Sequence, residues 1–336
     1  MGDPQAPFET VLAVLRGHGL LQQDRLRDDV QLVSMGDHFD FGAPDQRAQA
    51  TADGLALVTW LASHPPEQVV LLAGNHDLAR LCELGPFSTD AAFEAAFEQA
   101  SRVYRHGADE AAFLSRYPHL PDAEALARDF SCFNVAQQSL VRRLFDAGRF
   151  RVAHAHRNLL LVHAGVTDDD FALLGHPPRT AAEAAALLNA ESLPRLHQPG
   201  AASTGFARGI FFQRPAFPAS GPEFEGPLRR RYDPRRLPAA FPQAIGHIRD
   251  QKCHQLLAPW ARDAAPLDGP LRSLVVDGDD VHYARGTLPD ARLYFLDGGM
   301  NYAAPARFQL FDLDARAALR PLHVEAGHDG DVVREP

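Results

Sequence analysis

Acidic, amide and imidazole side chains recur in five short motifs along the chain. The motifs are Gly2-Asp3-Pro4-Gln5, Gly36-Asp37-His38-Phe39-Asp40, Gly74-Asn75-His76-Asp77, His163-Ala164-Gly165 and Gly246-His247. Carboxylate, amide-oxygen and imidazole ligands suit manganese, iron or zinc better than thiolate-preferring ions. One such motif alone would be an ordinary turn. Their number and order, with most of them directly after an expected strand, indicate a shared metal site.

Taken in order, the motifs resemble the signature of the calcineurin-like metallophosphoesterase superfamily, which reads D-x-H, GD-x-x-D, GNH-[DE], H-[AG]-G and GH. The last two look most like the branch that holds serine/threonine phosphatases and diadenosine polyphosphate hydrolases. The resemblance spans residues 2–247, and Leu296-Asp297-Gly298-Gly299-Met300 also looks like the closing strand of that branch. It implies an α/β fold, a four-layer sandwich with two central mixed β-sheets flanked by helices.

The resemblance also implies a dinuclear site with six ligands. The side chains that match the family's ligand positions are Asp3, Gln5, Asp37, Asn75, His163 and His247. The first two would hold one ion, the last three the other, and Asp37 would bridge both. Two ions roughly 3.5–4 Å apart lower the pKa of a shared water and clamp an in-line displacement, as phosphoryl hydrolysis requires. We therefore expect two divalent metal ions, with manganese favoured and iron, zinc or magnesium as alternatives.

The catalytic roles implied by the resemblance fall on His76 and Asp40. His76 follows a ligand but is not expected on the metals. It would act as the general acid that protonates the leaving oxygen, and Asp40 would keep its imidazole charged and oriented.

Three features depart from the family's pattern. Gln5 stands where most relatives carry His, so the first site is all-oxygen, favours Mn²⁺ or Mg²⁺ and holds its ion loosely. Phe41 replaces the Arg that phosphatases of this branch use to hold phosphate, which weakens the case for protein-phosphatase specificity. Asp3 lies so close to the first residue that the strand expected before it is missing, and we expect the natural chain to start further upstream.

Substrate contacts must then come from other basic residues. Arg249 follows the Gly-His motif, and Arg208 and Arg214 lie in an irregular stretch that we expect near the site, so these three are the candidates. The runs Arg229–Arg231 and Arg235–Arg236 are typical of a solvated face. Five histidines match no functional position of the family's motifs, and we expect them to be structural or at the surface: His38, His154, His156, His254 and His282. The phenylalanines of the irregular stretch are expected to form its core: Phe206, Phe211, Phe212 and Phe217.

The elements that position these residues alternate between strands and helices. Apolar spacing predicts helices over residues 7–21, 46–63 and 181–190. Strands are expected over residues 30–35, 69–73, 151–155, 158–163, 243–247, 274–277, 281–285, 293–297 and 308–313. We expect a single domain over residues 1–336, with a helical insert at 81–150, an irregular cap segment at 193–242 and a frayed tail beyond residue 324.

The composition excludes several classes of partner. The 33 basic and 43 acidic residues give a net charge of −10, which opposes binding to nucleic acid or anionic membranes. The three cysteines are an odd number without C-x-x-C spacing, which indicates buried thiols in a reducing compartment. There is no signal-like start and no apolar run long enough to span a bilayer, so we expect a cytoplasmic protein. Its oligomeric state is not indicated.

The function expected from these features is metal-dependent hydrolysis of a phosphate ester, by a phosphatase acting on a small phosphorylated molecule or a phosphoprotein. Two alternatives remain on the same scaffold: a nucleoside polyphosphate (diadenosine-type) hydrolase, or a phosphodiesterase, for which the charge argues against polymeric substrates. A third alternative is a catalytically degenerate metal-binding scaffold. Gln5 and Phe41 favour it, whereas the intact Asp40, Asn75 and His76 oppose it.

Overall fold

The N-terminal half of the chain builds a small parallel sheet. The computed structural model describes residues 1–175, 177–192, 196, 210–217 and 230–321. The sheet has the order β3-β4-β5, and its strands are β3 (Leu32–Ser34), β4 (Val69–Leu72) and β5 (Phe150–Arg151). Apolar residues fill β4 almost continuously, as expected for a parallel strand that is covered on both faces.

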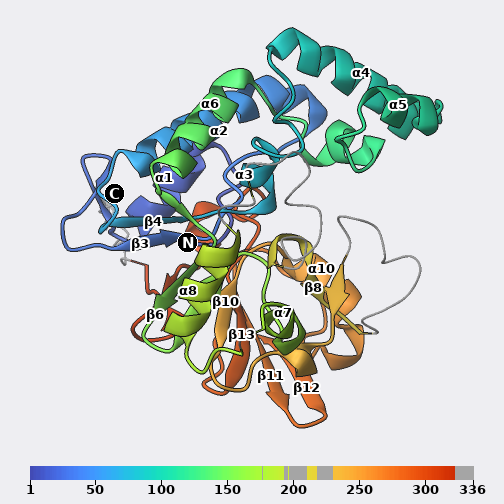
Figure 1. Cartoon of the computed structure of the whole chain (residues 1–336). Coiled ribbons are helices and arrows are strands. Elements are labelled where there is room, and N and C mark those ends of the chain that lie inside the picture. The colour runs from blue at the N-terminus through green and yellow to red at the C-terminus, as the bar shows by residue number, and fades with distance from the viewer. Residues whose placement is uncertain (176, 193–195, 197–209, 218–229, 322–336) are drawn as a thin grey trace, which may run out of the picture.

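The two faces of β4 pack against different layers. Val69 and Leu71 belong to the core beneath the helices, whereas Val70 and Leu72 pack with the second sheet. Figure 1 shows the helices that cover the outer face: α1 (Phe8–Gly17), α2 (Arg47–Ala62) and α6 (Val135–Asp146). Gly17 and Gly19 end the first helix four residues earlier than the apolar spacing predicted, and a short hairpin follows, formed by β1 (Leu21–Gln22) and β2 (Arg25–Leu26).

The second sheet is larger and mixed. Its order is β12-β11-β13-β10-β7-β6, and only β7, β10 and β13 run parallel to one another. The strands are β6 (Ala153–His156), β7 (Leu159–Val162), β10 (Gln243–Ile245), β11 (Arg272–Asp277), β12 (Asp280–Arg285) and β13 (Ala291–Phe295). Helix α8 (Ala181–Ser192) packs on β6 and β7 from outside. The expected α/β fold with a large mixed sheet flanked by helices is therefore confirmed, although the smaller sheet is parallel rather than mixed.

Helices fill the connection between β4 and β5. They are α3 (Asn75–Ala79), α4 (Asp90–His106), α5 (Glu110–Arg116), a π-helical turn (Ala125–Asp129) and α6. The hydroxyl of Thr89 caps α4 by accepting from Ala92 N (3.1 Å), and Gly107 ends it with a left-handed backbone. The segment is helical as expected, while its assignment as an insert within one domain stays a prediction.

The region expected to form an irregular cap is described only in part. Its described residues include a two-stranded parallel ladder, β8 (Arg214–Pro215) with β9 (Arg231–Tyr232). Phe211 and Phe212 are buried as predicted, but Phe217 is 46% exposed and packs edge-on against Trp260, so its assignment to a core is wrong. Phe206 and the tail beyond residue 324 lie outside the described residues.

Short elements complete the chain. They are α7 (Asp168–Leu173), α10 (Asp250–Leu256), β14 (Phe311–Asp312) and β15 (Ala317–Ala318). The strand predicted over residues 308–313 shrinks to β14, which pairs with β15 instead of joining a main sheet. The three cysteine side chains are buried, as predicted. Among the described residues, no helix is both long and apolar enough to cross a membrane.

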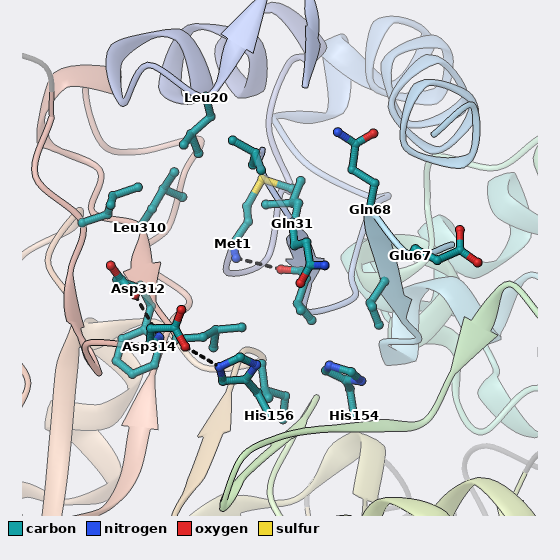
Figure 2. A pocket seen from close by; sticks show the side chains of 18 of the residues that line it. Met1, Leu20, Gln31, Glu67, Gln68, His154, His156, Leu310, Asp312 and Asp314 are labelled. Atoms are coloured by element: carbon teal, nitrogen blue, oxygen red, sulfur yellow. Dashed lines mark hydrogen bonds and ion pairs between the residues drawn. The ribbon is translucent and has the colours of Figure 1, made fainter. Parts of the chain in front are cut away.

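The first residue lies along the free edge of β3. The amino group of Met1 donates to Val33 O (2.8 Å), and Met35 N donates to Met1 O (3.1 Å), which is a single step of parallel pairing. A cavity of about 720 Å³ opens here between the two sheets (Figure 2). His154 and His156 line it, and His156 Nε2 bonds to Asp314 (2.9 Å). None of the predicted metal ligands lines this cavity.

Candidate metal centre

The predicted ligands follow strands that end at the same edge of their sheets. Asp37 comes shortly after β3 and Asn75 shortly after β4, while His163 and His247 follow β7 and β10. Because β3 and β4 are parallel, as are β7 and β10, each pair of carboxyl ends meets at one edge. The fold therefore brings together residues more than 200 positions apart.

A cluster of three buried side chains forms the centre. One ligand atom from each of Asp37, His163 and His247 lies within 4.8 Å of the other two. His163 Nδ1 donates to Met35 O (2.9 Å), so its Nε2 faces Asp37 Oδ2 (3.3 Å) and Asn75 Oδ1 (3.1 Å). Two oxygen acceptors and an imidazole nitrogen thus point at one place, where a proton or a metal ion must sit.

Unusual backbone conformations support this arrangement. Asp37 and His247 have φ of +56° and +63°, which few non-glycine residues adopt. Asp77 stabilises the turn at Asp37: its carboxylate accepts from the backbone N–H of both Asp37 (2.9 Å) and Gly74 (2.8 Å). It also accepts from His38 Nδ1 (2.8 Å), so this histidine has the structural place expected of it. Strained turns held by buried hydrogen bonds are typical of functional sites.

Asp3 joins the centre from the chain start. Its Oδ2 accepts a hydrogen bond from His247 N (2.7 Å), while its buried Oδ1 has no hydrogen-bond partner among the described residues. Burial raises the pKa of Asp3 well above its usual range, and the charges of Asp297 and Asp37 add to this rise. Buried carboxylates crowded in this way need a nearby cation to stay ionised.

Gln5 lies at the loop that carries Asp40. Its Nε2 donates to Phe39 O (2.8 Å) and Asp40 O (3.2 Å). These bonds determine the orientation of the amide, because Nε2 is its only donor and Oε1 is left as the acceptor. Oε1 is therefore the atom with which Gln5 could bind a metal. Phe41, the other departure from the family pattern, is buried in a small apolar cluster with Ala50 and Cys132.

The donor set fits divalent metal ions. His247 Nε2 is buried and, like Asp3 Oδ1, has no hydrogen-bond partner among the described residues. Burial lowers the pKa of His247 well below its usual value, and the charge of Arg214 adds to this effect, so the ring is neutral and can act as a ligand. Orphaned buried donors and acceptors are costly unless something binds them. A bound cation would satisfy both atoms and would stabilise the carboxylate of Asp3.

His76 lies next to this centre in an ordered hydrogen-bond chain. Its Nδ1 donates to Asp40 Oδ2 (2.9 Å), and its Nε2 is 3.9 Å from Asp37 Oδ2. Burial would lower the pKa of His76, but the charges of Asp37 and Asp40 outweigh it and raise the pKa. Phe130 packs edge-on against the ring. Asp40 therefore orients the His76 ring and favours its protonated form, with Nε2 as the ring nitrogen that faces Asp37.

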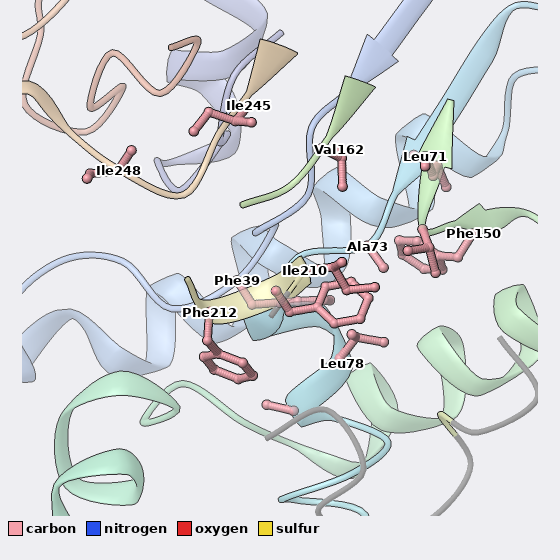
Figure 3. Close-up of a cluster of buried hydrophobic side chains, with 14 of the residues drawn as sticks. Phe39, Leu71, Ala73, Leu78, Phe150, Val162, Ile210, Phe212, Ile245 and Ile248 are labelled. Carbon is pink, nitrogen blue, oxygen red and sulfur yellow. The ribbon is translucent and has the colours of Figure 1, made fainter. Parts of the chain in front are cut away.

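A buried arginine that the motifs did not indicate stabilises Asp40. Arg80 is fully buried and donates to Asp40 Oδ2 (2.5 Å), to His76 O (2.8 Å) and to Cys132 O (2.8 Å). Asp40 Oδ1 accepts from Cys132 N (2.8 Å), so both oxygens of this carboxylate are used. Figure 3 shows a cluster of buried apolar side chains that includes Phe39, and the centre of the Phe39 ring lies 4.4 Å from the Arg80 guanidinium. The only sequence signal is that Arg80 lies four residues, one helical turn, after His76.

The predicted substrate arginines have different locations. Arg214 lines a pocket of about 360 Å³ that opens beside Asn75 and His76. The described lining does not include Arg249, which bonds to both carboxylate oxygens of Asp268 (3.0 and 3.1 Å) and lies 3.6 Å from the Tyr302 ring centre. Its role in substrate binding stays a prediction, against which this pairing argues. Arg208 lies outside the described residues.

The arginine run interpreted as a solvated face divides between two environments. Arg230 and Arg231 are half-buried and line the pocket beside His76, so the interpretation is wrong for them. Arg235 and Arg236 are exposed and pair with Asp233 and Asp169, as expected for a solvated face. Sequence reasoning missed two further basic residues of the pocket, which are Arg128 and Lys252.

Comparison with known proteins identified one family. Residues 1–199, more than half of the chain, match the family model described as calcineurin-like phosphoesterase. No curated protein and no solved structure gave a significant match.

Proposed function

Since the chain belongs to the calcineurin-like phosphoesterase family and is thus a metal-dependent hydrolase of phosphoric esters, we propose that it removes a terminal phosphoryl group at a dinuclear centre. The observation that carries this proposal is the convergence of Asp37, His163 and His247 within 4.8 Å, next to the orphaned Asp3 Oδ1. Asn75 and Gln5 complete the proposed ligand set. The substrate is a small phosphorylated molecule rather than nucleic acid, because the net charge of −10 repels a polyanionic chain.

The metal pair, when bound, supplies an activated water and neutralises charge on the phosphoryl oxygens. The protein's own residues supply the proton. His76 Nδ1 is bonded to Asp40, so Nε2 carries the proton that the leaving oxygen requires. Arg80 is not catalytic in this scheme, since it is buried and acts through Asp40 as a positioning residue.

Manganese is the metal we propose for the first site. Asp3, Gln5 and Asp37 offer it only oxygen atoms, whereas His163 and His247 give the second site imidazole nitrogen. An amide oxygen is a weaker ligand than imidazole, so the first ion should bind more loosely than the second. Activity of the purified protein should therefore rise on addition of Mn²⁺.

The first test is a substrate panel with Mn²⁺, Mg²⁺, Zn²⁺ or Fe²⁺ added. Phosphomonoesters, phosphodiesters, nucleoside polyphosphates and phosphopeptides separate the phosphatase from the diesterase and polyphosphatase alternatives. A protein that binds metal but hydrolyses none of these would instead be a degenerate scaffold.

The second test examines the general acid. His76→Ala should keep the metal content and lower kcat by about 10²–10⁴-fold on an alkyl phosphate, whose leaving group needs a proton. The loss should be much smaller for p-nitrophenyl phosphate, whose leaving group is stable as an anion. The matched control is His106→Ala, because His106 is exposed at the end of α4. This substitution should leave kcat on both substrates unchanged. Equal losses on both substrates would show that His76 is not the acid.

A further inference from the structure

Two glutamine side chains hold the turn that follows His163. The carbonyl oxygen of Gly165 accepts a hydrogen bond from Gln213 Nε2 (2.8 Å). Val166 exchanges two hydrogen bonds with the side-chain amide of Gln243, one through its N–H (2.9 Å) and one through its carbonyl oxygen (2.7 Å). Since His163 lies only two residues before Gly165, the place of its ring depends on how firmly these residues are held.

Gln213 joins this turn to a buried carboxylate. It lies directly before β8, its side chain is fully buried, and its Nε2 donates to Asp170 Oδ2 (2.8 Å) as well as to Gly165 O. Both acceptors are oxygen atoms, so the reversed amide, with Oε1 against them, is excluded. In the observed orientation, Oε1 is buried and has no hydrogen-bond partner among the described residues. An apolar side chain would avoid that cost, so packing alone does not account for a glutamine here.

Asp170 gives the Gln213 amide a fixed anchor. Its carboxylate is fully buried in the first turn of α7 and accepts from the N–H (2.9 Å) and the hydroxyl (2.8 Å) of Thr167. Arg230, which precedes β9, donates to the other carboxylate oxygen (2.9 Å). These donors determine where the carboxylate lies. It in turn determines where the Gln213 amide meets Gly165.

The residue before Gln213 reaches the other imidazole of the centre. The backbone of Phe212 is hydrogen-bonded to the His247 ring. The centres of the His163 and His247 rings lie 4.9 Å apart. Two consecutive residues, Phe212 and Gln213, therefore support the two imidazoles that the proposed second site requires.

We propose that Gln213 is a positioning residue for the second metal ion. The inference rests on the proposed function and deepens it. Gln213 contacts neither the substrate nor the ion in this scheme. It holds the Gly165 carbonyl, and thereby the turn that directs His163 Nε2 toward Asp37. A ligand held in this way is already ordered when the ion binds, whereas a looser turn must first be ordered, which weakens binding.

The experiment measures the affinity of the protein for Co²⁺ and Zn²⁺ by competition with a chelator, without substrate. Gln213→Met removes both donors but keeps about the same side-chain length. It should weaken binding of the tighter ion by about 10–100-fold, the effect typical of disturbing the groups that support a metal ligand. The visible absorption spectrum of bound Co²⁺, which depends on the geometry of its ligands, should change as well.

The matched control is Gln138→Met in α6. The amide of Gln138 also donates to backbone carbonyls, those of Leu84 (3.1 Å) and Gly85 (3.0 Å), but it supports no residue of the metal centre. Both substitutions remove hydrogen bonds, so both should lower the stability of the metal-free protein in urea. Only Gln213→Met should lower the metal affinity.

The outcomes separate this inference from the proposed function. Wild-type affinity and an unchanged Co²⁺ spectrum in Gln213→Met, or an equal loss of affinity in Gln138→Met, would overturn the positioning role and leave the proposed function intact. If Gln213→Met does not fold, Gln213→Asn keeps an amide but shortens its reach by one methylene. It should show a smaller loss of affinity, and wild-type affinity there would also overturn the role. A wild-type protein that binds no divalent ion would overturn the proposed function, and this inference with it.

Discussion

Gly246→Ala should disrupt the metal centre without straining the backbone. Gly246 precedes His247 and has no positive φ, so alanine is compatible with its conformation. A Cβ at this position would lie 1.8 Å from Asp3 Oδ1 and 2.8 Å from Asp3 Cγ. The carboxylate oxygen would have to retreat by more than about 1.5 Å to reach an ordinary contact distance.

The size of the effect follows from what that retreat breaks. Asp3 Oδ2 accepts from His247 N at 2.7 Å, and the raised pKa of Asp3 favours its neutral form when no metal is bound. A hydrogen bond between neutral groups contributes about 0.5–1.5 kcal/mol, and the metal-free protein should lose a similar amount of unfolding free energy. Displacing a ligand should also lower the affinity of the first metal by at least about 10–100-fold, the effect typical of disturbing the groups that support a metal ligand.

Two measurements test this reasoning. Urea unfolding without metal gives the stability change, and mass spectrometry after dialysis gives the metal retained per chain. The matched control is Gly17→Ala at the end of α1, where a Cβ meets nothing within 4 Å and the helix should gain about 0.5–1 kcal/mol. If Gly246→Ala kept wild-type stability and bound Mn²⁺ as tightly as the wild type, Asp3 would not be a ligand supported by the His247 turn.

Three further substitutions probe the surrounding network. Arg80→Gln removes a buried partner of Asp40, so it should lower the free energy of unfolding in urea by about 3–5 kcal/mol and also lower kcat. A variant with wild-type stability would show that Asp40 needs no buried cation. Asp77→Asn turns one acceptor into a donor facing the N–H groups at the Asp37 turn. It should cost about 3 kcal/mol in metal-free thermal unfolding, and an unchanged Tm would contradict this account. Gln5→His should raise metal retention after dialysis and shift activation from Mn²⁺ toward Zn²⁺ or Fe²⁺. If the native protein already retains two tightly bound ions, Gln5 is not a weakened ligand.

Much of the candidate site could be predicted because its residues occupy local positions with a mechanical meaning. His163 follows an apolar strand directly, and a residue at the carboxyl end of a parallel strand faces the sheet edge where ligands meet. The same holds for Asn75 after β4 and for His247 after β10. These predictions depended on the resemblance of the motifs to the family's pattern and on the short apolar strands before the motifs, and both can be read along the sequence.

The residues that were missed act through partners far along the chain. Arg80 bonds to Asp40 and Gln137, which are 40 and 57 residues away, and Asp77 bonds to His38. Apart from its position one helical turn after His76, nothing close to Arg80 in sequence distinguishes it from a surface arginine. Arg249 is close to a predicted ligand in sequence, yet it is paired with Asp268, 19 residues further on, and its role in substrate binding stays a prediction.

The sequence by itself determined which atoms can meet a metal ion, because the type of a ligand is a property of its side chain, and the strand that precedes it aims it at the sheet edge. The tertiary structure decided which charged side chains lie close to one another. Arg128, Arg231 and Lys252 are scattered over 125 positions, yet they line one pocket. Coulombic interaction depends on distance in space and on exclusion of water, and the fold alone determines both for residues so far apart in sequence.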